Sequence, residues 1–286
     1  MKRFVLTLAF LFGAVQAQAA DPAPAYPAHT IPNSLLRALP KNADGRSYQL
    51  HIHLPGSFAK EPKRRYPVLY VTDGYWDFAT VVASYNNLAY DQVVPEFIVV
   101  GLGYAGDNLD YGSLRRWELS PVAMGEGSGQ ADKFLAALER EIFPLLEREY
   151  RADPAQRYLA GSSLGGLFTL HAMYAKPDLF KGYIAASPAV VAGNDWIIGQ
   201  AKAHAETGKP IKARLYVTGA EHEWPAFLAG IKRYQALLPA LKHPELVYQN
   251  RTIDGERHAG TKAESYTRGM RFLFEPLAPE KGPSKD

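Results

Sequence analysis

Apolar and polar residues follow two different periods along this chain. Residues 48–54 alternate between apolar and polar positions, which is typical of a strand with one buried face. The runs 67–72 and 97–101 are almost continuously apolar, as expected for strands that are covered on both faces of a parallel sheet. Residues 125–130 mark a loop, and apolar residues then recur at helical spacing over 134–145.

The second half of the chain alternates strands with helices. Strands are expected at 157–162, 182–187, 214–218 and 246–253, and helices at 166–175, 225–241 and 262–274. Repeated strand–helix units favour an α/β fold, a mostly parallel, doubly wound sheet with helices on both faces. We predict one such domain over residues 41–276, after an extended lead-in at 21–40 and before a polar tail at 277–286.

Residues 1–20 have the pattern of a secretory signal peptide. Basic residues precede an apolar run of 12 residues, from Phe4 to Val15, and small residues offer cleavage sites after Ala19 or Ala20. The apolar run is too short to cross a bilayer of about 30 Å as a helix. We therefore expect a periplasmic or secreted protein that has no membrane-inserted segment once the signal peptide is removed.

Composition narrows the chemistry that this domain can perform. The 286 residues include no cysteine, which excludes disulfide bonds, thiolate metal ligands and a cysteine nucleophile. The net charge is +3, and loss of the signal peptide brings it closer to zero, so neither nucleic acid nor an anionic membrane is expected as a partner. His51 and His53 have no obvious third ligand and are expected to be polar positions on a solvated strand face.

The segment Gly161-Ser162-Ser163-Leu164-Gly165 matches the G-x-S-x-G pattern of a nucleophile elbow. A short apolar strand is expected directly before it and an apolar helix directly after it. A serine on such a tight turn exposes its hydroxyl at the carboxyl edge of the sheet, and the flanking glycines permit a turn that a Cβ would obstruct. We predict that Ser163 is a nucleophile.

A serine hydroxyl needs a base that removes its proton, and eight histidines are available. In α/β hydrolases with this elbow, the chain order is nucleophile, acid, histidine, and the histidine lies in the loop after the last strand. His258 occupies that loop, between the last expected strand and the last expected helix. His222 is the one serious rival, and it stands beside the candidate acids.

The acid should follow the strand at 214–218, where the chain carries Glu221 and Glu223. Either carboxylate could accept a hydrogen bond from the second ring N–H of the histidine and stabilise its cation. Glu223, just before the helix expected at 225–241, is our first choice and Glu221 the second. Asp195, after the preceding strand, is a third option.

An oxyanion requires backbone N–H donors, which we assign to Leu164, after the nucleophile, and to Tyr75, in the turn after an early strand. Trp76 is a candidate substrate contact, although the aromatic residues at 75–78 could equally pack in the core. Arg115 is a second candidate, because it could form a local basic surface toward an anionic ester. The long connections at 75–95 and 104–130 are expected to wall the pocket.

Several segments together resemble the bacterial "putative esterase" group of α/β hydrolases, which includes siderophore, feruloyl and acetyl-xylan esterases, S-formylglutathione hydrolase and mycolyltransferases. These segments are residues 66–74, 115–121, 158–167, 176–188 and 255–258. The resemblance implies the α/β-hydrolase fold, ester hydrolysis by a Ser–acid–His triad, and no metal or organic cofactor. The exported, siderophore-esterase-like branch is the most similar, which implies a small-molecule ester as substrate.

We therefore expect an exported serine esterase that forms an acyl-enzyme on Ser163. Two alternatives stay open at this point. An acyltransferase of the same fold would pass the same acyl group to an alcohol or sugar, and a non-catalytic binding protein would retain the fold without the chemistry. The presence of all three triad residue types in the right order favours catalysis.

Overall fold

The computed structural model describes residues 30–279 of the chain. The predicted signal peptide, residues 21–29 of the predicted lead-in and residues 280–286 of the predicted tail lie outside the described residues. Within residues 30–279, no helix combines the length and the apolar character needed to cross a membrane.

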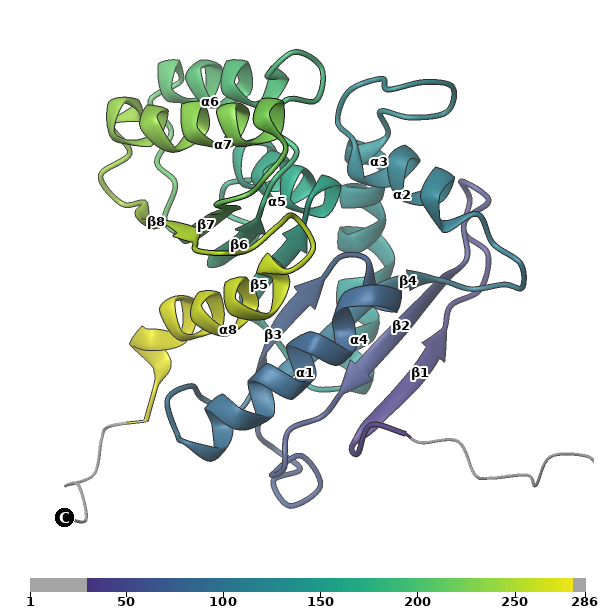
Figure 1. The fold of residues 1–286 in the computed structure, drawn as a ribbon. Coiled ribbons are helices and arrows are strands. Elements are labelled where there is room, and N and C mark those ends of the chain that lie inside the picture. The colour runs from purple at the N-terminus through teal and green to yellow at the C-terminus, as the bar shows by residue number, and fades with distance from the viewer. Residues whose placement is uncertain (1–29, 280–286) are drawn as a thin grey trace, which may run out of the picture. The chain divides into compact units, whose positions relative to one another are not determined.

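One eight-stranded sheet forms the centre of the described chain, with the spatial order β1-β2-β4-β3-β5-β6-β7-β8 (Figure 1). The strands are β1 (Ser34–Ala38), β2 (Tyr48–His53), β3 (Tyr66–Val71), β4 (Ile98–Tyr104), β5 (Ala152–Ser162), β6 (Gly182–Ala186), β7 (Arg214–Ala220) and β8 (Val247–Ile253). β2 is antiparallel to both of its neighbours, and all other pairs are parallel. The strand order reverses at β3, so the carboxyl ends of β3 and β5 lie side by side where such sheets bind ligands.

Helices cover both faces of this sheet. They are α1 (Gly74–Tyr90), α2 (Tyr111–Leu119), α3 (Ala131–Ala137), α4 (Phe143–Glu149), α5 (Leu164–Ala175), α6 (Trp196–Glu206), α7 (Pro225–Leu237) and α8 (Thr261–Phe274). α1 and α8 pack against each other on one face, as Figure 1 shows, and α3 to α7 contribute to the buried cluster on the other. The predicted α/β architecture with a doubly wound, mostly parallel sheet is therefore confirmed.

The core is divided between the two faces of the sheet, and β3 shows how. Val68 and Tyr70 belong to the buried cluster on the side of α3 to α7, whereas Leu69 and Val71 belong to the cluster beneath α1 and α8. All four side chains are fully buried. Since alternate residues of a strand point to opposite faces, only a continuous apolar run can fill both clusters, which explains the pattern at 67–72.

The first third of the described chain differs from the sequence prediction. The lead-in contains β1, which pairs with β2 as an antiparallel edge strand. The strand face predicted to be solvated at His51 and His53 is covered by α1, so that prediction is wrong. His53 is buried, hydrogen-bonds Ser34 at 3.0 Å and packs on Tyr85 of α1, and this burial lowers its pKa.

Two predicted helices are interrupted at prolines. The helix predicted over 134–145 is divided into α3, a π turn at Leu138–Ile142, and α4, whose second residue is Pro144. A proline removes one N–H and its ring crowds the carbonyl four residues earlier, so a wider turn just before it relieves the clash. The helix predicted over 225–241 similarly ends at Leu237, and a 3₁₀ turn containing Pro239 follows.

Candidate active site

Ser163 stands on the turn between β5 and α5 in a strained conformation. Its backbone angles are φ 60° and ψ −117°, a region that non-glycine residues rarely occupy. Three backbone hydrogen bonds hold the turn: the Ser163 N–H donates to Ala186 at 3.0 Å, and its carbonyl accepts from Leu167 at 2.9 Å and Ala189 at 3.0 Å. The strained conformation places this serine at the carboxyl edge of the sheet, and the three hydrogen bonds offset its energetic cost.

The two glycines of the motif are required by close packing. A Cβ on Gly161 would collide with the backbone of Gly165, and a Cβ on Gly165 would collide with the hydroxyl of Thr72. Thr72 follows β3 directly, and its N–H donates to Ala160 of β5 at 2.9 Å. The end of β3 thus lies against the turn that carries Ser163, which places residues after Thr72 near Ser163.

His258 and Glu223 form a hydrogen-bonded pair. The distance from Nδ1 of His258 to one carboxylate oxygen of Glu223 is 2.8 Å, and the side chain of Glu223 is 0% exposed. The other carboxylate oxygen accepts the N–H of Trp224 at 3.1 Å. An ionised carboxylate accepts from Nδ1–H, which leaves Nε2 of the imidazole with the lone pair that a general base requires.

The carboxylate of Glu221, the second-choice acid, hydrogen-bonds the backbone of the loop after β8. Its half-exposed carboxylate accepts the N–H of Gly255 at 2.7 Å, which ties the end of β7 to the loop after β8. Asp195 pairs instead with Arg233 at 2.6 Å, and the rival base His222 lies on the exposed side near Glu221, 3.9 Å away. Of the candidate acids, the structure therefore brings only Glu223 to His258.

Ser163 and His258 line one cavity of about 440 Å³. Most of its wall is apolar, and the apolar side chains that line it are Trp76, Met124, Leu164, Ala189, Val191, Ala192, Trp224, Phe227 and Ala259. Its polar lining residues are Asp73, Arg115, Ser162, Ser163, His258 and Lys262. The ring of Trp224 lies over His258 with 4.8 Å between the ring centroids. Trp76 and Trp224 remain 47% and 60% exposed, so the mouth of the cavity presents aromatic surface to solvent.

Both connections predicted to wall the pocket do so, and each contains a helix. The connection at 75–95 forms most of α1 and contributes Trp76, whereas that at 104–130 contains α2 and contributes Arg115 and Met124. The aromatic residues at 75–78 were expected either to line the cavity or to pack in the core. Trp76 lines the cavity, whereas Phe78 is buried in the core.

Arg115 lies in the cavity wall, and its guanidinium forms an ion pair with Asp73. Nε and one terminal nitrogen each donate to a different carboxylate oxygen of Asp73, both at 2.8 Å. Burial opposes the charge, yet the hydrogen bonds and the charge of Asp73 raise the pKa of Arg115 above its usual value. The pair with Asp73 uses two of the five N–H donors of the guanidinium, and the predicted role of Arg115 as a substrate contact stays a prediction.

The predicted oxyanion donors both lie in the first turn of a helix. Leu164 is the first residue of α5 and Tyr75 the second residue of α1. N–H groups in a first helical turn have no acceptor within the helix, and the positive end of the helix dipole lies there. Both helices begin at the edge of the sheet that carries Ser163, so the geometry is compatible with the predicted role.

Sequence reasoning missed a buried charge network beside this cavity. Lys262 lines the cavity and its Nζ lies 2.5 Å from a carboxylate oxygen of Asp77, which is 0% exposed. The hydroxyl of Tyr266 donates to the other oxygen. Burial raises the pKa of Asp77. The only sequence signal was the four-residue spacing of Lys262 and Tyr266, which places both on one face of α8.

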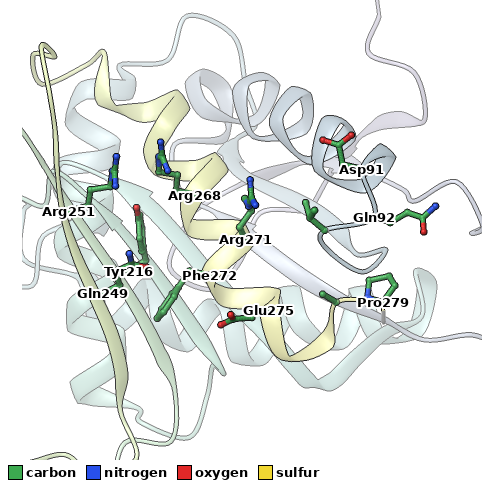
Figure 2. A pocket seen from close by; sticks show the side chains of 12 residues that line it. Asp91, Gln92, Tyr216, Gln249, Arg251, Arg268, Arg271, Phe272, Glu275 and Pro279 are labelled. Carbon is green, nitrogen blue, oxygen red and sulfur yellow. The ribbon is translucent and has the colours of Figure 1, made fainter. Parts of the chain in front are cut away.

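A second, larger cavity of about 730 Å³ lies between α8, β8 and the loop after α1 (Figure 2). Figure 2 shows Arg251 and Arg268 flanking the Tyr216 side chain. Both arginines pair with the same carboxylate oxygen of Glu264, at 3.2 and 2.6 Å. This cavity shares no lining residue with that of Ser163, and no group of three or more potential metal ligands occurs within residues 30–279.

Comparison with known proteins identifies the class of protein that this fold and site define. Residues 42–224, more than half of the chain, match the family described as "Putative esterase". The chain belongs to this esterase family, as its sequence motifs predicted. It is a carboxylic ester hydrolase with the α/β-hydrolase fold.

Individual relatives place the chain near enzymes that act on siderophores. It is 25% identical over 272 residues to the ferri-bacillibactin esterase BesA of Bacillus subtilis (strain 168), a match that covers 88% of this chain and 93% of that protein. It is 31% identical over 186 residues to the siderophore triacetylfusarinine C esterase of Aspergillus fumigatus, covering 63% of each protein. The crystal structure of the BES protein from Bacillus cereus is similar with a TM-score of 0.78 and 25% identity, covering 87% of this chain and 99% of that one.

Proposed function

We propose that this protein is an exported serine esterase that hydrolyses siderophore-type esters through an acyl-enzyme on Ser163. One observation carries the proposal. Ser163, on its strained turn, and His258, oriented by the buried carboxylate of Glu223, line the same cavity. A nucleophile, a base and a residue that orients the base are the parts that acyl transfer through serine requires.

Acylation begins when Nε2 of His258 accepts the hydroxyl proton of Ser163. The serine oxygen then bonds to the ester carbonyl carbon, and the negative charge on the carbonyl oxygen is stabilised by the N–H groups of Leu164 and Tyr75. Glu223 stabilises the imidazolium formed at this stage. His258 returns the proton to the alkoxide as the carbon–oxygen bond of the ester breaks, so the alcohol leaves neutral.

Deacylation uses the same residues with water as the nucleophile. His258 accepts a proton from water, whose oxygen adds to the acyl carbon. The serine oxygen then leaves and takes that proton from the imidazolium, which frees the carboxylic acid and restores Ser163.

The cavity supports a substrate recognised by flat apolar surface. The two cations in its wall, Arg115 and Lys262, are each paired with a buried carboxylate, so the wall carries little unbalanced charge. Trp76 and Trp224 present half-exposed aromatic rings at its mouth. Such rings bind planar groups by stacking. The siderophore esterases among the relatives supply the class of ester that we propose.

Export is proposed from the pattern of residues 1–20. Expression in a Gram-negative host followed by fractionation and N-terminal sequencing tests it. We expect the protein in the periplasm with a mature N-terminus at Ala20 or Asp21. A protein that stays in the cytoplasm with residues 1–20 attached would contradict export without affecting the proposed chemistry.

The proposed chemistry is tested with wild-type protein and the Ser163→Ala variant. We expect wild-type protein to hydrolyse p-nitrophenyl butyrate and siderophore esters, presented with and without iron, while Ser163→Ala retains only background activity. Mass spectrometry should find a fluorophosphonate adduct on Ser163. Equal rates for the two proteins would overturn the mechanism, whereas hydrolysis of p-nitrophenyl butyrate alone would overturn the substrate class.

A further inference from the structure

The first turn of α1 carries two buried carboxylates on either side of Tyr75. Asp73 is the residue before the helix, in the left-handed conformation with φ 54°, and Asp77 lies one turn later. The side chain of Asp73 is 5% exposed and that of Asp77 is 0% exposed. Tyr75 itself is 60% exposed, and its ring stacks on that of Tyr111 of α2 with 4.8 Å between the ring centroids.

A different element anchors each carboxylate. Asp73 receives two hydrogen bonds from Arg115 of α2, both at 2.8 Å. Asp77 is held from α8, by the ammonium of Lys262 at 2.5 Å and by the hydroxyl of Tyr266. The turn that contains the Tyr75 N–H is therefore fixed from two sides.

The first turn of α8, which carries Lys262, also contacts the loop of the proposed base His258. Thr261, the residue before Lys262, donates its hydroxyl hydrogen to the carbonyl of His258 at 2.9 Å. The first turn of α8 thus contacts both the histidine loop and the first turn of α1. A displacement of α8 relative to α1 would change the position of Tyr75 relative to His258.

We propose that Lys262 and Arg115 are positioning residues for the oxyanion donor at Tyr75. Neither is assigned a contact with the reacting atoms. They act through Asp77 and Asp73, which fix the peptide that carries the donor. A hydrogen-bond donor aimed at a developing charge must be placed to within about 0.5 Å to be effective, and rigid charge-assisted hydrogen bonds provide that precision. This inference rests on the proposed function.

Charge supplies a second reason for the two cations. Asp73 and Asp77 both lie in the turn that faces the developing oxyanion. Burial is the main cause of the raised pKa of Asp77, and the charge of Asp73 raises this pKa further. Unpaired, these carboxylates would repel the oxyanion and disfavour the transition state. Arg115 and Lys262 neutralise one carboxylate each, so that the N–H dipoles dominate.

Lys262→Met, Lys262→Arg, Asp77→Asn and the double variant Lys262→Met with Asp77→Asn test the role of Lys262. Each is assayed for kcat and KM with p-nitrophenyl butyrate and for inhibition by phenylboronic acid, whose boron accepts the serine oxygen and mimics the tetrahedral intermediate. Arg268→Met is the matched control, because Arg268 is also an ion-paired cation of α8 but lies outside the Ser163 cavity.

We expect Lys262→Met to lower kcat and to raise the boronate inhibition constant by the same factor, roughly 10-fold or more, with KM nearly unchanged. Lys262→Arg should restore most of the loss. The fall in kcat of the double variant should be no larger than that of Lys262→Met alone. Both changes disrupt the same interaction, and Asp77→Asn removes the buried charge that Lys262→Met leaves unpaired. Arg268→Met should match wild-type protein in all three constants.

Three results would overturn the inference while leaving the proposed function intact. These are constants for Lys262→Met within twofold of wild type, a rise in KM alone, or a fall in kcat with unchanged boronate inhibition. A wild-type protein that neither hydrolyses the ester nor binds the boronate would overturn the proposed function, and the inference with it.

Discussion

Nδ1 of His258 lies 2.8 Å from a carboxylate oxygen of Glu223, and the side chain of Glu223 is completely buried. The residues come from the loops after β8 and β7, two adjacent parallel strands. Adjacent parallel strands end at the same edge of the sheet, so their loops meet there. Because Nδ1 is engaged by the carboxylate, Nε2 is the ring nitrogen left to act as a base toward Ser163, the proposed nucleophile.

Replacing Glu223 should therefore impair catalysis far more than replacing Glu221. Glu223→Gln keeps the shape of the side chain but can favour the wrong tautomer of His258, and we expect kcat to fall by about 10³- to 10⁴-fold. Glu221→Gln changes a half-exposed carboxylate that binds a backbone N–H, and should keep kcat within a few-fold of wild type. Steady-state hydrolysis of p-nitrophenyl butyrate decides between them, and a loss confined to Glu221→Gln would reverse the assignment.

The packing of the nucleophile turn makes a prediction about stability. Gly165→Ala should destabilise the protein by about 2 kcal/mol or more, because the new methyl group would collide with the buried hydroxyl of Thr72. Gly199→Ala, within α6, is the control: a Cβ there would meet nothing within 4 Å, and alanine should stabilise the helix by up to about 1 kcal/mol. Urea unfolding of both variants measures the difference, and equal midpoints would contradict the packing argument.

Glu118 should make stability depend on pH. Burial raises the pKa of this α2 residue from 4.5 to about 7, although Tyr48 donates a hydrogen bond to it at 3.0 Å. Between pH 4.5 and 7 the folded protein keeps a proton that the unfolded chain has released, so the free energy of unfolding falls as pH rises through this window. At about 1.4 kcal/mol per pKa unit, the loss above pH 7 amounts to about 3 kcal/mol.

The Glu118→Gln variant isolates this contribution. It should unfold with nearly the same free energy as wild type at pH 4.5 and be the more stable protein at pH 8. Glu149→Gln is the control: hydrogen bonding to Arg148 lowers the pKa of Glu149, so its contribution is lost only below about pH 4.5 and the stability difference should change little between pH 5 and 8. Denaturant unfolding across this pH range provides the measurement. A stability difference for Glu118→Gln that does not change with pH would show that Glu118 is not the titrating group.

The aromatic mouth of the cavity should affect substrate preference. Trp224→Ala removes a ring that lies over His258 and is 60% exposed. We expect KM for p-nitrophenyl benzoate to rise by about 2- to 10-fold relative to KM for p-nitrophenyl acetate, since an aromatic contact contributes about 0.5–1.5 kcal/mol. Tyr90→Ala, which removes an 88% exposed ring outside this cavity, should leave the ratio unchanged. An unchanged ratio in Trp224→Ala would exclude stacking at this position.

Much of the architecture could be predicted from local patterns. The continuous apolar run at 67–72 indicated a strand buried on both faces, and the elbow around Ser163 indicated a strand, a turn and a helix in immediate succession. Both depend on residues within a few positions of one another. The solvated face predicted at His53 was wrong because α1, some 30 residues later in the chain, folds back over it.

The sequence by itself predicted the order of the candidate nucleophile, acid and histidine, because strand alternation and motif spacing are local properties. It left Glu221 and Glu223 unresolved, since two residues of one loop differ only in where their side chains point. The tertiary structure placed the carboxylate of Glu223 against His258 and that of Glu221 against the N–H of Gly255. It also paired Asp77 with Lys262, which are separated by 185 positions. That pair forms only because α1 and α8 pack side by side on one face of the sheet, and a cation from the other helix offsets the cost of burying a carboxylate between them.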